Sequence, residues 1–261
     1  MKLILKNLSL GYGKKTILQD ISCPEVAPGS LIGVLGANGV GKSSLLRSIA
    51  GFQDYNGEVL ANGQALQALP QKKRSQLVSY LPQTLPQPTS LTAYEAVISA
   101  IRAVREFASK EEINRLTEQV FDQLGIRHLA FQSLASMSGG QRQLIGLAQV
   151  LVRKPELLLL DEPTSALDLK WQMSVFEVVR NTIRERHGIC LMAIHDINLA
   201  MRQCDYILLL ADGQCLSFGT PKEAMTAAHL EKAYGVSGRV EFCSQGTPYV
   251  IADTILHKNL V

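Results

Sequence analysis

The stretch from Gly36 to Ser43 constrains the fold of this chain more than any other. It reads GANGVGKS, follows the short apolar run SLIGVL (30–35) and precedes SLLRSIA (44–50), which has the pattern of a helix. A glycine-rich turn between a strand and a helix gathers backbone N–H groups around one point, where they can hold phosphate oxygens. The chain is therefore expected to build a parallel α/β sheet with a phosphate-binding loop at the end of one strand.

Two residues of this loop carry the remaining chemistry. Lys42 is placed to reach the β- and γ-phosphates of a nucleotide, and the hydroxyl of Ser43 is placed to ligate Mg²⁺. The helix that follows adds the positive end of its dipole. We therefore predict a nucleotide site formed by the loop and the residue after it: Gly36, Ala37, Asn38, Gly39, Val40, Gly41, Lys42, Ser43 and Ser44.

Composition and charge exclude several classes of protein. With 261 residues, 46% hydrophobic, the chain can form one large domain or two small ones. Its net charge of +3 comes without a basic cluster in the sequence; the densest run, Lys72–Arg74, is interpreted as a solvated helix start, so nucleic acid is not expected as a partner. No stretch resembles a membrane span or a signal peptide, and the five cysteines lack a C-x-x-C spacing, which fits a reducing cytosol.

The strand pattern supports an α/β fold. The apolar runs LLLL (157–160) and ICLMAI (189–194) do not alternate with polar residues, as expected for parallel strands covered on both faces. Strands are expected at 3–10, 17–22, 31–35, 58–60, 77–81, 157–160, 189–194, 206–210 and 214–217.

Between Leu91 and Val152 the pattern becomes helical. Ser109 begins a capping box with Glu112, and a second box begins at Thr220. We expect a single domain divided into a nucleotide-binding α/β core (1–85 and 151–225), a helical subdomain (86–150) and a C-terminal tail (226–261). The tail is expected to hold two small helices or turns and a hairpin (239–243 with 248–251).

Two carboxylates, Asp161 and Glu162, come directly after the buried run at 157–160. Ligands of parallel sheets bind at the carboxyl ends of the strands, so these acids should lie beside the phosphate loop. Asp161 is then placed to hold Mg²⁺, through water, and Glu162 to polarise an attacking water molecule. The alternative is a pair of acids in a solvent-exposed turn.

The run Ser138-Gly139-Gly140-Gln141 has the spacing of a capping box before a helix at 142–151. Its double glycine would weaken a helix start but leaves backbone N–H groups open to a phosphate. Together with the phosphate loop and Asp161-Glu162, this run resembles the ATP-binding-cassette (ABC) ATPases. The resemblance extends from Leu3 to about Met225, in the motif order of that family.

The resemblance implies a P-loop NTPase core with an antiparallel β subdomain and an inserted α-helical subdomain. It also implies ATP and Mg²⁺ as ligands, with Tyr12 stacked on adenine, Gln83 touching Mg²⁺ or the attacking water, and His195 contacting the γ-phosphate. The catalytic set is then Glu162, His195, Gln83 and Lys42. The alternatives are an ordinary tyrosine at a strand end, a polar loop residue and a histidine without a ligand.

In that family, the Ser138–Gln141 segment closes the nucleotide site of the other subunit. The resemblance therefore implies a head-to-tail pair around two ATP molecules, formed with a second copy or a similar chain, in which Asp168 of the 165–168 loop also acts in trans. Met137 and Ser44 stand where the family often has Leu and Thr, respectively, and these exchanges keep size and chemistry.

A narrower resemblance begins at His195 and continues through Asp212-Gly213 and the segment 218–221. It is to the ATPases of iron-siderophore, haem and vitamin B12 importers, and the tail at 230–236 fits the same group. It implies a peripheral protein at the cytoplasmic face of the plasma membrane, with a permease and an extracytoplasmic binding protein as partners. The Gln83 loop and the insert from Leu85 to about Phe107 would then receive a cytoplasmic helix of the permease.

Two other functions are compatible with the phosphate loop. One is an ABC ATPase that acts on ribosomes or chromosomes, although such proteins usually carry two cassettes or a long coiled coil. The other is a nucleotide-binding regulator without turnover, against which Glu162, Gln83 and His195 argue.

Overall fold

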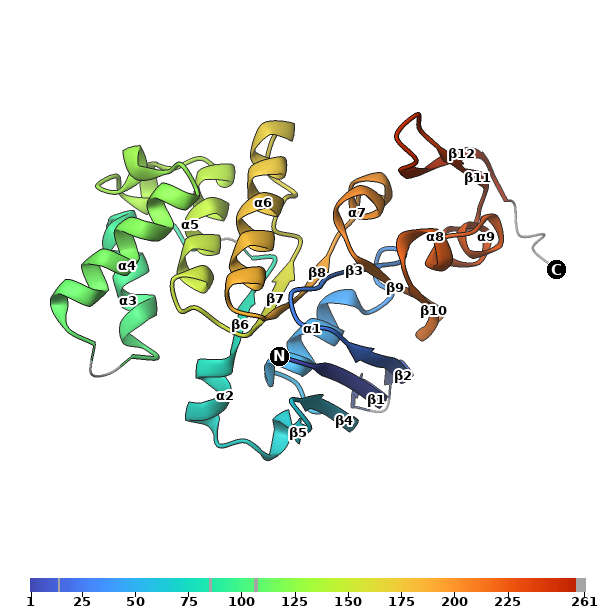
Figure 1. Cartoon of the computed structure of the whole chain (residues 1–261), viewed down its shortest axis with the longest axis horizontal. Helices are drawn as coiled ribbons and strands as arrows, with labels where there is room; N and C mark the ends of the chain where they lie inside the picture. Colours follow the sequence, from blue (N-terminus) through green and yellow to red (C-terminus); the bar gives the residue numbers. More distant parts are fainter. Residues whose placement is uncertain (14, 85, 106–107, 257–261) are drawn as a thin grey trace.

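The chain forms an α/β fold around a six-stranded sheet (Figure 1). The computed structural model describes residues 1–13, 15–84, 86–105 and 108–256. Five strands are parallel and β10 is antiparallel at one edge. In order across the sheet, the strands are β10 (Gln214–Gly219), β9 (Tyr206–Ala211), β3 (Leu31–Leu35), β8 (Ile189–Ala193), β7 (Leu157–Asp161) and β6 (Val78–Leu81).

The central strands are buried on both faces, which explains their unbroken apolar runs. Every residue of β3, β7 and β8 is buried. On one face lies α1 (Lys42–Ala50), whose Leu45, Leu46 and Ile49 belong to one apolar cluster with side chains of both sheets. The second sheet, antiparallel and outside α1, has the order β2 (Lys15–Val26), β1 (Leu3–Tyr12), β4 (Asn56–Ala61) and β5 (Gln64–Ala65).

The opposite face of the sheet and the inserted segment are helical. The helices α6 (Leu169–Glu185) and α7 (Ile197–Gln203) share one large apolar cluster with the insert. The insert contains α3 (Ala93–Arg102), α4 (Lys110–Gln123) and α5 (Gly139–Leu151), and α2 (Gln71–Leu77) precedes β6. Short 3-10 turns occur at Leu66–Ala68, Arg127–Leu129 and Leu134–Ser136.

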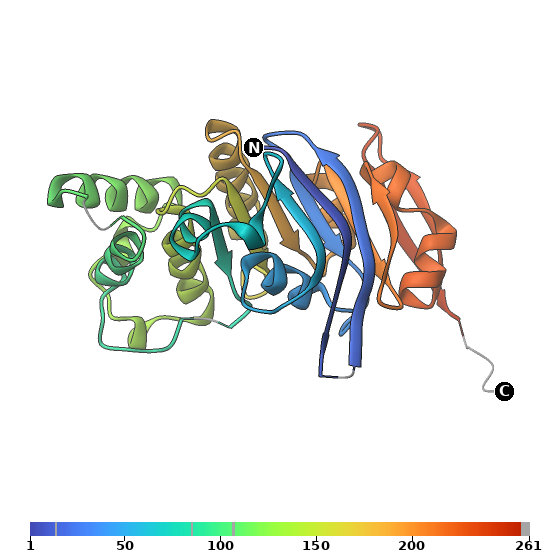
Figure 2. The same ribbon diagram turned by 90° about the horizontal axis from the view of Figure 1, so that it is seen from below.

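The tail consists of α8 (Pro221–Ala224), α9 (Ala227–Tyr234) and a hairpin of β11 (Val236–Phe242) and β12 (Pro248–Ile255). Figures 1 and 2 place the insert and the tail at opposite ends of the molecule. Among the described residues, no helix has both the length and the apolar character needed to cross a bilayer.

The predicted strands and the two sheet types are confirmed, with β5 as a short addition. The helix expected at 142–151 begins three residues earlier, at Gly139, because Ser138 and Gln141 form a complete capping box. The box at Thr220 is complete, whereas at Ser109 only the serine caps the helix. The carboxylate of Glu112 instead pairs with Arg105 at 3.0 Å. The subdomain boundaries stay predictions, and Leu85 and Phe107 lie outside the described residues.

Candidate nucleotide site

The phosphate loop lies between β3 and α1, as the sequence predicts. Gly36, Gly39 and Gly41 have φ values of 144°, 78° and 114°, which favour glycine. A Cβ on Gly36 would lie 2.4 Å from the carbonyl oxygen of Leu210 on β9, so only glycine fits there. No side chain caps the start of α1, which leaves its first N–H groups available to a phosphate.

Lys42 is folded into this loop. Its side chain is 5% exposed, and Nζ donates to the carbonyl oxygens of Gly36 at 2.7 Å and Ala37 at 3.2 Å. Burial lowers the pKa of Lys42, while the nearby carboxylates of Glu162 and Asp161 oppose that shift. A buried ammonium group surrounded by loop carbonyls is poised to exchange them for phosphate oxygens, which carry far more negative charge.

Asp161, at the carboxyl end of β7, lies next to α1. Its Oδ1 accepts a hydrogen bond of 2.9 Å from Ser43 Oγ, and its Oδ2 accepts one of 3.2 Å from the Tyr80 hydroxyl. Burial is the main cause that raises the pKa of Asp161, and burial also raises that of Tyr80. The hydroxyl and carboxylate predicted for Mg²⁺ are therefore adjacent, and hard oxygen donors of this kind suit the ion.

The donor set fits Mg²⁺ bound with few protein ligands. Among the described residues, no group of three His, Cys, Asp or Glu side chains is arranged to hold a metal ion. Mg²⁺ commonly keeps several waters and binds one or two protein oxygens together with substrate phosphates. The pair Ser43 and Asp161 is compatible with that mode.

The carboxylate of Glu162 contacts two other predicted catalytic residues. Its Oε1 contacts Nε2 of His195, and its Oε2 accepts a hydrogen bond of 3.0 Å from Nε2 of Gln83. The backbone of Glu162 has a left-handed φ of 54°, and its N–H donates to the carbonyl of Ala193 at 3.2 Å. A non-glycine residue in this conformation is uncommon and, at a buried position, often functional.

The strand order explains why these residues converge. β8 lies between β3 and β7, so His195, just after β8, comes between the phosphate loop and Glu162. Gln83 follows β6, on the other side of β7. Together with the loop, they surround an open cavity of about 420 Å³, within the usual size range of ligand pockets. Its lining residues are Ile17, Asn38, Gly39, Gly41, Lys42, Ser43, Ser44, Gln83, Glu162 and His195.

Other predicted site residues lie outside this lining. Gly36 and Ala37 contact Lys42 from behind the loop, and Asp161 reaches the site through Ser43. Tyr12 is 54% exposed, at the end of β1. None of Ser138, Gly139, Gly140, Gln141 and Asp168 lines the cavity either.

The segment at 138–141 has a defined shape of its own. The Ser138 hydroxyl accepts from the N–H of Gln141 at 3.2 Å, and Gln141 Oε1 accepts from the N–H of Ser138 at 2.9 Å. A Cβ on Gly140 would lie 2.9 Å from the carbonyl of Ala166. Asp168 caps α6 by accepting from the N–H of Trp171 at 3.0 Å. The segment and the 165–168 loop are therefore packed together at one surface.

Two residues of the site were not foreseen from the sequence. The position of Tyr80 in the site depends on strand pairing, because Tyr80 on β6 lies beside Leu159 on β7. Gln143 is 4% exposed, donates to the carbonyl of Glu162 at 2.7 Å and accepts from the N–H of Ala166 at 3.3 Å. A glutamine within an otherwise apolar helix face was the available signal. It connects α5 directly to Glu162.

Comparison with known proteins agrees with this geometry. Residues 18–165 match the family described as ABC transporter. The hemin import ATP-binding protein HmuV of Bordetella avium is 36% identical over 248 residues, covering 92% of this chain and 94% of the relative. The ferric enterobactin transport ATP-binding protein FepC of Escherichia coli (strain K12) is 31% identical over 250 residues, covering 94% and 92%.

Solved structures give the same result. An inward-facing metal-chelate type ABC transporter contains a chain with a TM-score of 0.78 and 26% identity, covering 99% of both chains. An ATP-binding subunit of an ABC transporter superposes with a TM-score of 0.74 and 26% identity, over 84% of this chain and 90% of that one. The chain therefore belongs to the ABC transporter family, and it binds and hydrolyses ATP.

Proposed function

We propose that this chain is the ATPase subunit of an importer for metal chelates, and that Glu162 activates the attacking water. The observation that carries the catalytic part is the Glu162 carboxylate, 9% exposed, with His195 on one oxygen and Gln83 on the other. A base held in one orientation beside a phosphate loop suits hydrolysis of a terminal phosphate.

Each residue of the site has a distinct task in that reaction. Lys42 and the N–H groups at the start of α1 bind the β- and γ-phosphates and stabilise the charge that spreads over them. Ser43 and Asp161 would hold Mg²⁺, which supplies charge compensation at the phosphates when bound. Gln83 and His195 orient Glu162 and can contact the water and the γ-phosphate, respectively.

A second copy of the chain completes the site in this proposal. The cavity is open, and the segment at 138–141 is capped, partly exposed and outside the lining of its own chain's cavity. The N–H groups of Gly139 and Gly140 and the Ser138 hydroxyl can then contact the γ-phosphate of the partner's ATP. The 165–168 loop, which contains Asp168, packs against Gly140 through Ala166, and Tyr12 remains exposed for the adenine. ATP would hold the pair together, and hydrolysis would release it.

A groove between the core and the insert is the proposed docking site of the permease. An open cavity of about 460 Å³ lies between the residues that follow β6 and the helices α3 and α5. Pro82, Pro86, Leu91 and Ala100 give it an apolar wall, and Gly146 on α5 lets Pro86 approach closely. Gln83 follows Pro82 of this wall and donates a hydrogen bond to Glu162. A permease helix in the groove would therefore change the position of Gln83 and, through it, that of Glu162.

The transported class is inferred from relatives that match almost the whole chain. HmuV is named for hemin import and FepC for ferric enterobactin transport, and a structural match that covers 99% of both chains is a metal-chelate type transporter. We propose a metal chelate of the haem, iron-siderophore or cobalamin type. An extracytoplasmic binding protein would deliver it, and this chain would work at the cytoplasmic face of the membrane.

Uptake by whole cells tests the proposal. In the source organism, deletion of the gene should abolish uptake of radiolabelled haem, a ferric siderophore or cobalamin. The wild-type gene should restore that uptake, and a gene carrying Glu162→Gln should not. Unchanged uptake of all three compounds would contradict the importer assignment. A phosphate-release assay on the purified chain tests the alternative of a regulator without turnover, because such a regulator would release no phosphate from ATP.

A further inference from the structure

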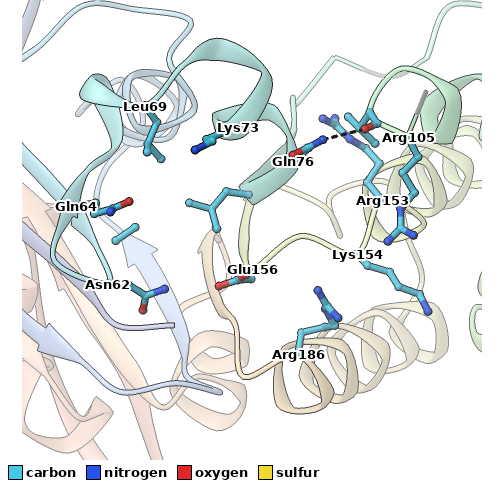
Figure 3. A pocket seen from close by; sticks show the side chains of 13 residues that line it. Asn62, Gln64, Leu69, Lys73, Gln76, Arg105, Arg153, Lys154, Glu156 and Arg186 are labelled. Carbon is cyan, nitrogen blue, oxygen red and sulfur yellow. Dashed lines mark hydrogen bonds between the residues drawn. The ribbon is translucent and has the colours of Figure 1, made fainter. Parts of the chain in front are cut away.

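A second cavity, of about 650 Å³, lies at the amino ends of strands β6 and β7 of the main sheet (Figure 3). Leu77 and Glu156, which line it, immediately precede β6 and β7. The opposite, carboxyl ends of these two strands lead to Gln83 and Glu162. The cavity is therefore separated from the nucleotide site by the length of the sheet, and the two sites share no lining residue.

The wall of this cavity is strongly basic. Among the described residues, this wall carries five basic side chains and one carboxylate, that of Glu156. For a chain with a net charge of +3, this concentration is local and does not follow from composition. The sequence does not reveal this concentration, because the five residues come from four separate segments of the chain. The densest basic run, Lys72–Arg74, contributes only one of them. The basic residues are Lys73, Arg105, Arg153, Lys154 and Arg186.

Most of this charge has no ion-pair partner. Arg105 pairs with Glu112, but among the described residues no carboxylate lies within 4.0 Å of the charged groups of the other four. Arg153 donates through Nη2 to the carbonyl of Ser75 at 2.7 Å, while its buried Nε has no partner. An unpaired buried donor costs free energy that a bound acceptor would restore.

Like charges also act on each other here. Burial is the first cause that lowers the pKa of Lys154, and the positive charges of Arg115, Arg105 and Arg186 lower it further, while the carboxylate of Glu185 opposes the shift. Burial likewise lowers the pKa of Arg153. A site whose cations repel one another is stabilised by a multiply charged anion, which removes the repulsion and supplies hydrogen-bond acceptors.

The arrangement of donors around the cavity favours a phosphate group. Figure 3 shows Arg153, Lys154 and Arg186 grouped on one side, with Lys73 and the amides of Asn62 and Gln64 across the opening. Guanidinium groups match the oxygens of a phosphate in pairs, and amide N–H groups add neutral donors. Nucleic acid is usually bound by a stripe of basic residues along a face, whereas these basic residues surround a single cavity.

We propose that this basic cavity binds the phosphate group of a small anion, with Arg153, Lys154 and Arg186 as its main donors. The site is additional to ATP hydrolysis and transport and does not depend on either. The phosphate can belong to a free metabolite or to the headgroup of an anionic lipid, because both present the same oxygens. The two sources are distinguished by the probe that binds.

The test uses the full chain with its phosphate loop already filled by Mg²⁺ and a non-hydrolysable ATP analogue. Calorimetry with inorganic pyrophosphate tests the free anion. Sedimentation with vesicles of phosphatidylglycerol and phosphatidylcholine, against phosphatidylcholine alone, tests the headgroup. We expect saturable binding in one arm, weakened when the ionic strength is raised from about 0.05 to about 0.5 M, since salt screens exposed charges.

The double variant Lys154→Asn/Arg186→Gln should weaken binding by about tenfold or more, because each lost hydrogen bond to a charged group is expensive. Asparagine tolerates the left-handed φ of 54° at position 154, and Arg186 is exposed, so the fold should be kept. Arg186→Gln alone provides a milder second variant. The matched control is Arg202→Gln/Lys232→Asn, which removes two exposed positive charges on α7 and α9.

Three results would overturn the proposal. The first is no saturable binding to pyrophosphate or to anionic vesicles. The second is equal loss of binding in the cavity variant and the control, which would indicate a general effect of charge. The third is tighter binding of a single-stranded oligonucleotide than of either probe, which would assign the cavity to nucleic acid.

Discussion

The hydroxyl of Tyr234, on the tail helix α9, accepts a hydrogen bond of 3.0 Å from the N–H of Gly36, the first glycine of the phosphate loop. The carbonyl of the same glycine accepts from Lys42 at 2.7 Å. Gly36 is buried, so its N–H depends on this partner. Burial raises the pKa of Tyr234 to about 12, so the hydroxyl stays neutral at physiological pH. The tail thus fixes the start of the loop.

Tyr234→Phe should therefore affect both stability and nucleotide binding. Leaving the N–H of Gly36 unpaired is expected to cost about 1–3 kcal/mol of the free energy of unfolding. We also expect the KM for ATP to rise several-fold with kcat nearly unchanged, because the loop loses order while Glu162 is untouched. Thermal unfolding and steady-state kinetics measure the two effects. Tyr249→Phe is the matched control, since its hydroxyl donates to Glu241 within the tail hairpin. Equal kinetics in both variants would contradict the role of Tyr234.

Glu162→Gln should retain ATP binding and lower turnover by about 10²–10⁴, the usual contribution of a positioned base. The amide keeps the size of the side chain but cannot accept a proton from water. Phosphate release and a fluorescent-nucleotide titration measure the two properties. Glu177→Gln, at an exposed position on α6, serves as the control. Normal turnover by Glu162→Gln would remove Glu162 from catalysis.

Lys42→Ala should lose nucleotide affinity itself. In the wild type, ATP at about 100 times its Kd is expected to add about 2.7 kcal/mol to the free energy of unfolding, which raises the melting temperature. The variant should show almost no such shift. Without nucleotide it should melt close to the wild type, since burial of the Lys42 charge is itself unfavourable. An undiminished ATP-induced shift would show that phosphate binding does not need this ammonium group.

Asp161→Asn should stabilise the nucleotide-free protein while weakening its response to Mg²⁺ and ATP. Burial raises the pKa of Asp161, so the folded state holds this proton more tightly than the unfolded chain does. As pH rises above the unfolded value of about 3.9, this group therefore reduces stability, and the reduction is complete above its folded pKa. Because asparagine does not ionise, Asp161→Asn avoids this reduction of the free energy of unfolding. At neutral pH we expect a higher melting temperature than the wild type without ligand; a lower one would contradict this sign.

Much of the fold and of the site could be predicted from the sequence because local patterns and global fold agree. The strand runs at 31–35 and 157–160 are apolar throughout, and each leads directly into its functional residues. Gln83 and His195 were identified only by resemblance, since no local pattern says that two separate loops meet at Glu162. That convergence depends on the strand order, which places β8 between β3 and β7.

The missed features share one cause. Gln143, Tyr80 and the basic cavity all depend on residues brought together from distant segments. The same holds for Tyr234, which lies 198 residues beyond Gly36. The capping box at Ser109 is incomplete for a different reason: the carboxylate of Glu112 pairs with Arg105, seven residues earlier in the chain, instead of with the backbone N–H that the local motif offers.

The central claim is that two copies meet across ATP, each giving its 138–141 segment to the other. Light scattering on Glu162→Gln with Mg²⁺ and saturating ATP tests it most directly. Because this variant should bind ATP without hydrolysing it, we predict a mass twice that of the 28.5 kDa chain with ATP and the single-chain mass without it. The contradicting result is a variant that binds ATP but keeps its single-chain mass, and that does not pair when its permease is also supplied.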